Sequence, residues 1–170
     1  MLKKAGGMKM HSNIYGLVKL QEPKAIEVEP FNEDSIDFED VSYFADYFKN
    51  NDNDFDAEVK WLTDFLKLDK EDIIKDNGET IIRLTKTKVK EYLERQYERF
   101  MNKVEDLDLD GFIKDSYSLR DMIDDVFSFH ICVDGCLDTL DEFMRDLYRW
   151  TLKDKDVVYY QVNGILDYHY

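Results

Sequence analysis

The spacing of apolar and polar residues divides the chain into predicted strands and helices. Residues 12–20 and 25–29 have the character of two short strands, and in the second of them Ile26 and Val28 alternate with glutamates. The two prolines, Pro23 and Pro30, both stand at breaks between predicted elements. The N-terminal part therefore predicts two strands joined by a turn around Pro23.

Three stretches in the middle of the chain repeat apolar residues at the spacing of an amphipathic helix: 38–49, 56–68 and 85–107. Their apolar faces comprise Val41, Phe44, Ala45 and Phe48 in the first, Val59, Leu62, Phe65 and Leu66 in the second, and Val89, Leu93, Tyr97, Phe100, Val104 and Leu107 in the third. Between the second and third we expect a short helix that Asp69 caps and that ends at Asn77-Gly78. A short strand over residues 80–84 follows.

The C-terminal third predicts a helix from residue 116 or 118 to 125, a strand over 127–133 and a helix over 137–152. In the strand, Phe127, Phe129, Ile131 and Val133 alternate with polar residues, and Gly135 ends it. Residues 157–162 and 165–170 then flank Asn163-Gly164, which is the typical sequence of a two-residue hairpin turn.

Together these elements predict a single α+β domain over residues 1–170, with residues 1–10 as a weakly ordered extension. The sheet is expected to be small and mostly antiparallel, built from the N-terminal strands, residues 127–133 and the C-terminal hairpin, and covered by several helices. No apolar run is long enough for a transmembrane helix, and the first residues lack the apolar core of a signal peptide. We therefore expect a cytoplasmic protein.

Charge changes this picture, because the formal net charge is −15 and the acidic residues are concentrated in two blocks, while the rest of the chain is net positive. Residues 27–58 contain twelve acidic residues and one lysine, and residues 105–146 contain thirteen acidic and three basic residues. Such a balance argues against direct binding to nucleic acid or to an anionic membrane, and it favours a basic protein partner. Aromatic residues run through the first block, so it has the composition of a folded segment.

The first block therefore predicts an acidic interaction surface, with a solvated face that only keeps the protein soluble as the alternative. Carboxylates on a rigid surface can also mimic the phosphates of DNA toward a protein with a basic groove, and exposed tyrosines serve as anchors. The predicted partner-binding residues are Glu33, Asp34, Asp37, Glu39, Asp40, Tyr43, Asp46, Tyr47, Asp52, Asp54 and Asp56.

Two further groups suggest metal ligands. His130 and Cys132 share one face of the predicted strand, Cys136 is expected in the helical turn after Gly135, and His169 or Asp134 would complete a zinc site. The alternative is two buried thiols and a buried histidine. The acids Asp106, Asp108 and Asp110, followed by Gly111, match the first half of a calcium-binding EF-hand loop, but Tyr117 stands where the bidentate glutamate belongs. A helix-ending acidic turn is the alternative there.

In length, lack of a targeting segment and its acidic–aromatic stretch over residues 31–48 (FNEDSIDFEDVSYFADYF), the chain resembles small phage-encoded inhibitors. These are anti-restriction proteins and the type II-A anti-CRISPR proteins. The resemblance implies a non-enzymatic protein of the bacterial host cytoplasm that binds a Cas9-type nuclease and blocks target-DNA loading or cleavage. Such nucleases hold nucleic acid in basic channels. No motif is matched, so no residue role is carried over.

Two other functions stay open from the sequence. One is a small zinc- or calcium-binding metalloprotein, either an enzyme or a regulator. The other is a housekeeping or immunity-type protein with no link to nucleic acid. The sequence leaves the choice between monomer and dimer undecided, since an exposed C-terminal edge strand can pair with a second copy.

Overall fold

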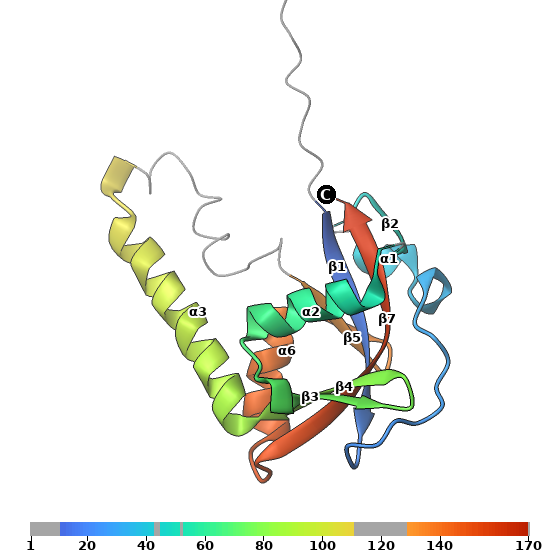
Figure 1. The fold of residues 1–170 in the computed structure, drawn as a ribbon. Helices are drawn as coiled ribbons and strands as arrows, with labels where there is room; N and C mark the ends of the chain where they lie inside the picture. The colour runs from blue at the N-terminus through green and yellow to red at the C-terminus, as the bar shows by residue number, and fades with distance from the viewer. Residues whose placement is uncertain (1–10, 43–44, 52, 111–128, 170) are drawn as a thin grey trace, which may run out of the picture.

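The computed structural model describes residues 11–42, 45–51, 53–110 and 129–169, and it confirms the predicted α+β class (Figure 1). Within this part, seven strands form one sheet in the order β3-β4-β7-β1-β5-β6, and β2 also pairs with β7. The strands are β1 (His11–Leu20), β2 (Tyr47–Asn50), β3 (Ile73–Asp76), β4 (Glu79–Thr85), β5 (His130–Val133), β6 (Cys136–Thr139) and β7 (Val157–His169). β1 and β5 run parallel and the other pairs are antiparallel, so the sheet is mostly antiparallel as predicted.

The predicted C-terminal hairpin is wrong, because β7 continues through Asn163-Gly164 as one strand. Gly16 of β1 pairs with Gly164 and Leu17 with Val162, so Asn163 is the extra residue of a β-bulge. Phe31 lies directly over the two glycines. A Cβ atom on Gly164 would lie 2.0 Å from the Phe31 carbonyl oxygen, and one on Gly16 would lie 2.3 Å from the Phe31 ring. Gly164 therefore serves the close approach of the segment around Phe31 to the strand and does not form a turn.

Two other dipeptides form the tight turns of the sheet. Asn77-Gly78 joins β3 to β4 and Asp134-Gly135 joins β5 to β6, and all four residues have positive φ, as a type I′ turn requires. The short helix predicted before Asn77 is therefore wrong in extent. Only a 3₁₀ turn, Lys70–Asp72 with Asp69 at its N-cap, is helical, and β3 begins at Ile73. The predicted helix start at residue 137 is also wrong. After β6, α6 (Leu140–Asp146) begins at a capping box of Thr139 and Glu142, and a π-helical turn, Leu147–Thr151, follows it.

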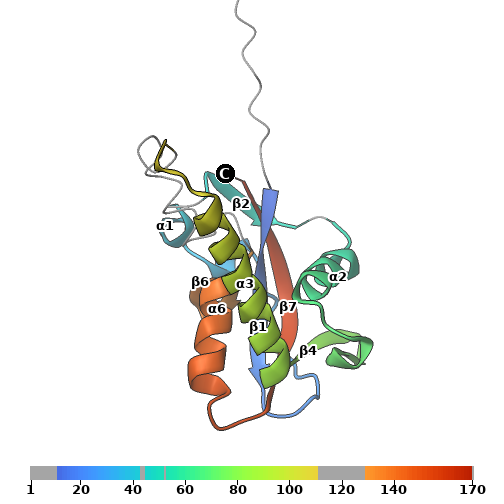
Figure 2. The ribbon, with the colours of Figure 1, turned by 90° about the vertical axis from the view of Figure 1, so that its left-hand side faces the viewer.

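One face of the sheet is covered by α2 (Phe55–Leu66), α3 (Lys86–Asp106) and α6. Figure 2 shows α3 in front of the strands with α6 beside it. The predicted inner face of α6, Leu140, Phe143, Met144 and Leu147, is confirmed, and Val59, Leu62 and Leu66 of α2 are buried with it in the larger of two apolar clusters. Phe65, which was predicted on the same face of α2, is instead 42% exposed. In α3 only the first turns are buried, at Val89 and Tyr92, while Tyr97 is 63% exposed.

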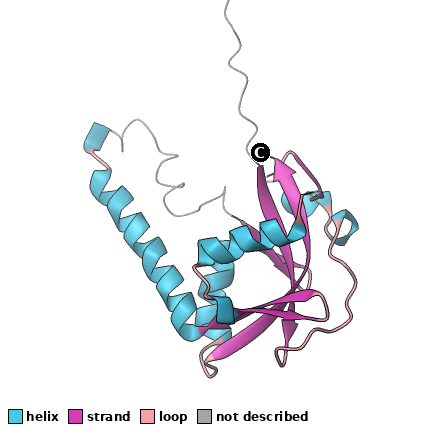
Figure 3. Cartoon of the chain, in the orientation of Figure 1, coloured by secondary structure: helices cyan, strands magenta, loops and turns pink. Residues whose placement is uncertain are grey.

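The opposite face carries a smaller cluster under short helical pieces, the 3₁₀ turn η1 (Glu33–Ser35) and α1 (Phe38–Val41). Figure 3 shows these turns on the other side of the strands from the long helices. Sheet residues Ile14, Cys132, Leu166 and Tyr168 meet Val41 and Ala45 there. The predicted helix over 38–49 is wrong in extent, because residues 47–50 form β2 against β7. Backbone pairing to the end of a long strand replaces the last turns of that helix.

Residues 24–36, called the strap below, cross this second face without forming the strand predicted at 25–29. The buried side chain of Gln161 takes the place of a strand neighbour. Its Oε1 accepts from the Ile26 N–H at 3.0 Å and its Nε2 donates to the Ile26 carbonyl at 3.1 Å. Further on, Asn163 Nδ2 donates to the Glu29 carbonyl at 3.1 Å and the Phe31 N–H donates to the Asn163 carbonyl at 3.1 Å. Two side chains and one backbone carbonyl of β7 thus bind the backbone of the strap at residues 26, 29 and 31.

Several predicted features lie outside the described residues. These are the extension over 1–10, the helix over 116–125 and the first residues of the strand over 127–133, which the structure shows as β5 from His130 onward. Across the described part of the chain, no helix combines the length and apolarity that crossing a membrane requires.

Candidate interaction surface

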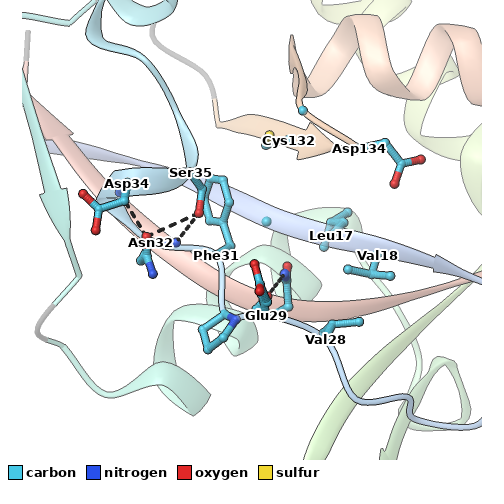
Figure 4. A pocket seen from close by; sticks show the side chains of 14 residues that line it. Leu17, Val18, Val28, Glu29, Phe31, Asn32, Asp34, Ser35, Cys132 and Asp134 are labelled. Atoms are coloured by element: carbon cyan, nitrogen blue, oxygen red, sulfur yellow. Dashed lines mark hydrogen bonds between the residues drawn. The ribbon is translucent and has the colours of Figure 1, made fainter.

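The two acidic blocks of the sequence meet around one groove on the strap face. The groove has a volume of about 910 Å³, and Figure 4 shows the side chains that line it. One wall is the strap from Val28 to Ser35, the other is the turn of the β5–β6 hairpin, and residues 16–18 of β1 form the floor. Glu29 and Asp34 come from the first acidic block and Asp134 comes from the second. No lysine or arginine is among the lining residues.

A second hollow of about 350 Å³ continues the groove, since both are lined by Ser35, Cys132 and Gly135. Its remaining lining residues are Ile36, Asp37, Asp40 and Leu137. Two carboxylates of α1 and the segment before it therefore extend the negative rim toward β6. The continuous surface formed by both hollows is called the acidic groove below.

Three further carboxylates are Asp138 of β6 and Glu142 and Asp146 of α6. Burial raises the pKa of the Asp138 carboxyl, and the charges of Glu142 and Asp146 raise it further. Asp138 therefore ionises less readily than an exposed aspartate, mainly because it is partly buried.

The strap carries its carboxylates on a hydrogen-bonded backbone. Asn32 caps η1, where its Oδ1 accepts from the Asp34 N–H at 3.0 Å and its own N–H donates to Ser35 Oγ at 3.0 Å. The Glu33 N–H donates to Asn50 Oδ1 of β2, also at 3.0 Å. These bonds hold the acidic residues in a defined arrangement before any partner binds.

The predicted partner-binding residues fall into separate places. Glu33, Asp34, Asp37, Glu39, Asp40 and Asp46 are exposed on the strap face, and Tyr47 is 53% exposed on β2. Asp54 and Asp56 instead belong to the start of α2 on the opposite face. Asp54 Oδ1 accepts from the Asp56 and Ala57 N–H groups, and Asp56 pairs with Lys75 at 2.5 Å. Tyr43 and Asp52 lie outside the described residues.

The groove also contains Glu29 and Asp134, which are not among the predicted partner-binding residues. The sequence pattern places Glu29 in a strand, and it indicates Asp134 only as a possible zinc ligand. The charge of the second block was the available signal, but nothing in the sequence indicates that Asp134 faces the strap. The chain passes from one face of the sheet to the other between β2 and α2, which is why one continuous acidic stretch divides between two faces.

The structure brings only part of the predicted zinc set together. His130 and Cys132 share a face of β5, where the His130 ring packs edge-on against Tyr168 at 5.4 Å between centroids. The type I′ turn places Cys136 opposite Val133 on β6, so Cys136 projects to the other face of the sheet from Cys132. The expected position of Cys136 in a helical turn is therefore wrong.

On the sheet, Ile14 pairs with both His130 and Leu166, so these residues lie side by side across three strands. His169 pairs with His11, three residues further along β7 than Leu166, and is therefore not level with His130. Among the described residues, no three His, Cys, Asp or Glu side chains are placed to hold one metal ion. Burial raises the pKa of the Cys132 thiol, which favours the neutral form at the floor of the groove. Zinc binding stays a prediction, but His130, Cys132 and Cys136 do not have the converging arrangement that the sequence predicts.

Of the predicted calcium ligands, Asp106 is the last residue of α3, and Asp108 and Asp110 are exposed beyond it. The rest of that loop, from Gly111 onward, lies outside the described residues. Calcium binding therefore also stays a prediction.

No known family model matches the chain, and no curated protein or solved structure shows significant similarity to it.

Proposed function

We propose that this protein is a non-enzymatic inhibitor that binds a basic, nucleic-acid-processing enzyme through the acidic groove. A Cas9-type nuclease is the partner class that fits the sequence resemblance, and blocking of target-DNA loading or cleavage is the expected effect. The observation that carries the proposal is the meeting of both acidic blocks around one groove that no lysine or arginine lines.

The physical reasoning is competition for positive charge. An enzyme that holds nucleic acid does so with lysines and arginines in a groove, and a folded surface with clustered carboxylates is attracted to the same groove. The hydrogen-bonded strap supports this role, because a preorganised surface loses less conformational entropy on binding. Tyr47 of β2 is 53% exposed, but its neighbour Phe48 packs in the cluster under the strap, so Tyr47 projects from the other face of the sheet and does not belong to the groove.

The test is a pull-down of a Cas9-type nuclease, with and without guide RNA, at about 0.05 M and about 0.5 M NaCl. That change shortens the screening length from roughly 14 Å to roughly 4 Å. We expect retention at low salt, loss at high salt and inhibition of target cleavage at low salt. Absence of binding in every condition, or retention that does not depend on salt, would contradict the proposal.

Two variants of equal charge locate the interaction. The first variant combines Glu33→Gln, Asp34→Asn, Asp37→Asn and Asp40→Asn, and the control combines Glu71→Gln, Glu98→Gln, Glu105→Gln and Asp154→Asn at exposed positions elsewhere. Exposed charge pairs contribute about 0.5 kcal/mol each, so the first variant is expected to bind roughly thirtyfold more weakly. Equal loss in both variants would mean that only net charge matters.

A further inference from the structure

One edge of β1 opens at the acidic groove. The parallel pairing with β5 ends at Leu17 and Val133, whereas the pairing of β1 with β7 continues to Leu20 and Tyr159. The turn at Asp134-Gly135 carries the chain back into β6 at that point. Within the described part of the chain, residues 18–20 therefore have a strand neighbour on the β7 side alone.

This edge and the charge around it face the same space. Val18, the first residue of the open edge, lies on the floor of the groove with Gly16 and Leu17. Figure 4 shows Val18 on β1 and Asp134 at the turn where β5 ends. Glu29 of the strap forms the other side. An incoming segment would thus meet backbone groups at the floor and carboxylates at the rim.

We propose that the acidic groove receives an extended, lysine- or arginine-bearing segment of the partner protein, which adds as a short strand to the edge of β1 at residues 18–20. Strand addition draws its affinity from main-chain hydrogen bonds and its specificity from alternate side chains. Here Glu29, Asp34 and Asp134 select basic side chains. This inference rests on the proposed function, since it names the part of the partner that binds.

The strap is held in place to form this site. Phe31 sits over Gly16 and Gly164, where neither strand has a side chain, and Gln161 and Asn163 bind the strap backbone on the β7 side. The strap therefore leaves the β5 side of the floor open. A partner strand follows the line of β5, and it does not need to displace the strap.

The experiment uses the full chain and a defined probe, the acetylated and amidated peptide Lys-Val-Lys-Val-Lys-Val-Lys. Binding is measured by fluorescence anisotropy at about 20 mM and about 200 mM NaCl, and ¹⁵N NMR locates it. We expect amide shifts centred on residues 16–20 and 133–135. A peptide with glutamate in place of lysine is expected not to bind. A peptide N-methylated at alternate residues keeps its charge but cannot donate along one edge, and is expected to bind at least about tenfold more weakly.

A matched pair of variants tests the rim. Glu29→Gln, Asp34→Asn and Asp134→Asn together are expected to weaken peptide binding about tenfold, and Asn tolerates the left-handed backbone at position 134. The control Glu71→Gln, Glu98→Gln and Glu105→Gln has the same net charge and is expected to bind as the parent does.

Three results would overturn the inference: shifts centred elsewhere, equal binding of the N-methylated peptide, or equal loss in the control. If the residue 18–20 amides instead respond to protein concentration and the protein dimerises in sedimentation, a second copy is the occupant and the inference fails. The proposed function is judged separately by the nuclease pull-down. Peptide binding without nuclease binding rejects the proposed function and keeps the strand-addition site. Salt-dependent nuclease binding without peptide binding keeps the proposed function and rejects strand addition at β1.

Discussion

Replacing the two facing glycines tests how the strap is held. A Cβ atom on Gly164 would meet the Phe31 carbonyl oxygen at 2.0 Å, and one on Gly16 would meet the Phe31 Cγ and Cβ at 2.3 and 2.4 Å. Real Cβ contacts are not this short, so either change must move the strap or the sheet. The two clashes differ in kind, because the first is with backbone and the second is with a side chain.

The magnitude follows from overpacking and from the bonds that depend on the strap's position. Overpacking costs typically 1–3 kcal/mol. Loss of the Phe31–Asn163 and Asn163–Glu29 hydrogen bonds would lower the free energy of unfolding by about 1 kcal/mol each. Replacing glycine by alanine would offset this by up to about 1 kcal/mol, because alanine reduces the conformational entropy of the unfolded chain. We therefore expect Gly164→Ala and Gly16→Ala each to lower the free energy of unfolding by about 2–4 kcal/mol. For a chain of this length that is a fall in Tm of roughly 4–16 °C.

The assay is urea denaturation followed by tryptophan fluorescence, arranged as two double-mutant cycles with Phe31→Gly. Removing the Phe31 side chain leaves no clash for Gly16→Ala, so the cost of Gly16→Ala is expected to fall by more than about 1 kcal/mol in that background. The cost of Gly164→Ala is expected to persist, because the carbonyl oxygen remains. Costs below about 0.5 kcal/mol, or an absence of coupling between positions 16 and 31, would refute the reasoning. A hairpin at Asn163-Gly164 would make Gly164→Ala costly without any coupling of Gly16 to Phe31.

Three further predictions concern the pH response, the helix caps and metal. Because the folded-state pKa of Asp138 is raised, its ionisation destabilises the fold as pH rises through that pKa. Asp138→Asn is therefore expected to raise Tm at about pH 7, with a gain that shrinks toward about pH 4, and an equal gain at both pH values would contradict the assignment. Asp54→Ala and Thr139→Ala each remove an N-cap, and each is expected to lower the free energy of unfolding, measured by urea denaturation, by about 1 kcal/mol. The control Glu98→Ala, at an exposed position, is expected to lower it by less than about 0.5 kcal/mol. No loss of stability in the two cap variants would mean that the caps are not formed. Because Cys132 and Cys136 project to opposite faces, dialysed protein is expected to hold less than one zinc per chain by elemental analysis, and stoichiometric zinc that Cys136→Ser removes would show that the ligands do converge.

The helices were predictable because their signal is local. Val59, Leu62 and Leu66 lie on one side of any helix formed over that stretch, and the cost of exposing them decides which side faces the sheet. The same holds for Leu140, Phe143, Met144 and Leu147 of α6. The helix over 38–49 failed although its pattern was similar, because residues 47–50 found hydrogen-bond partners on β7, which the local pattern does not contain.

The candidate site was predictable in charge but not in composition. The acidic character of residues 27–58 follows from their identity, and Glu33, Asp34, Asp37 and Asp40 are exposed as expected. The same block also supplies Asp54, which caps a helix on the opposite face, while Asp134 from the second block completes the groove. Membership of a surface depends on where the chain crosses the sheet, and that is set by contacts between distant segments.

The two Asn-Gly dipeptides separate what the sequence determines from what tertiary structure decides. The sequence by itself determined the α+β class, the amphipathic helices and the negative sign of the surface, because burial periodicity and charge belong to the residues themselves. It could not distinguish Asn77-Gly78, which turns a hairpin, from Asn163-Gly164, which lies within a strand. Glycine allows both a left-handed turn and a close approach. Only the packing of Phe31, brought from the other end of the chain, decides which of these properties Gly164 uses.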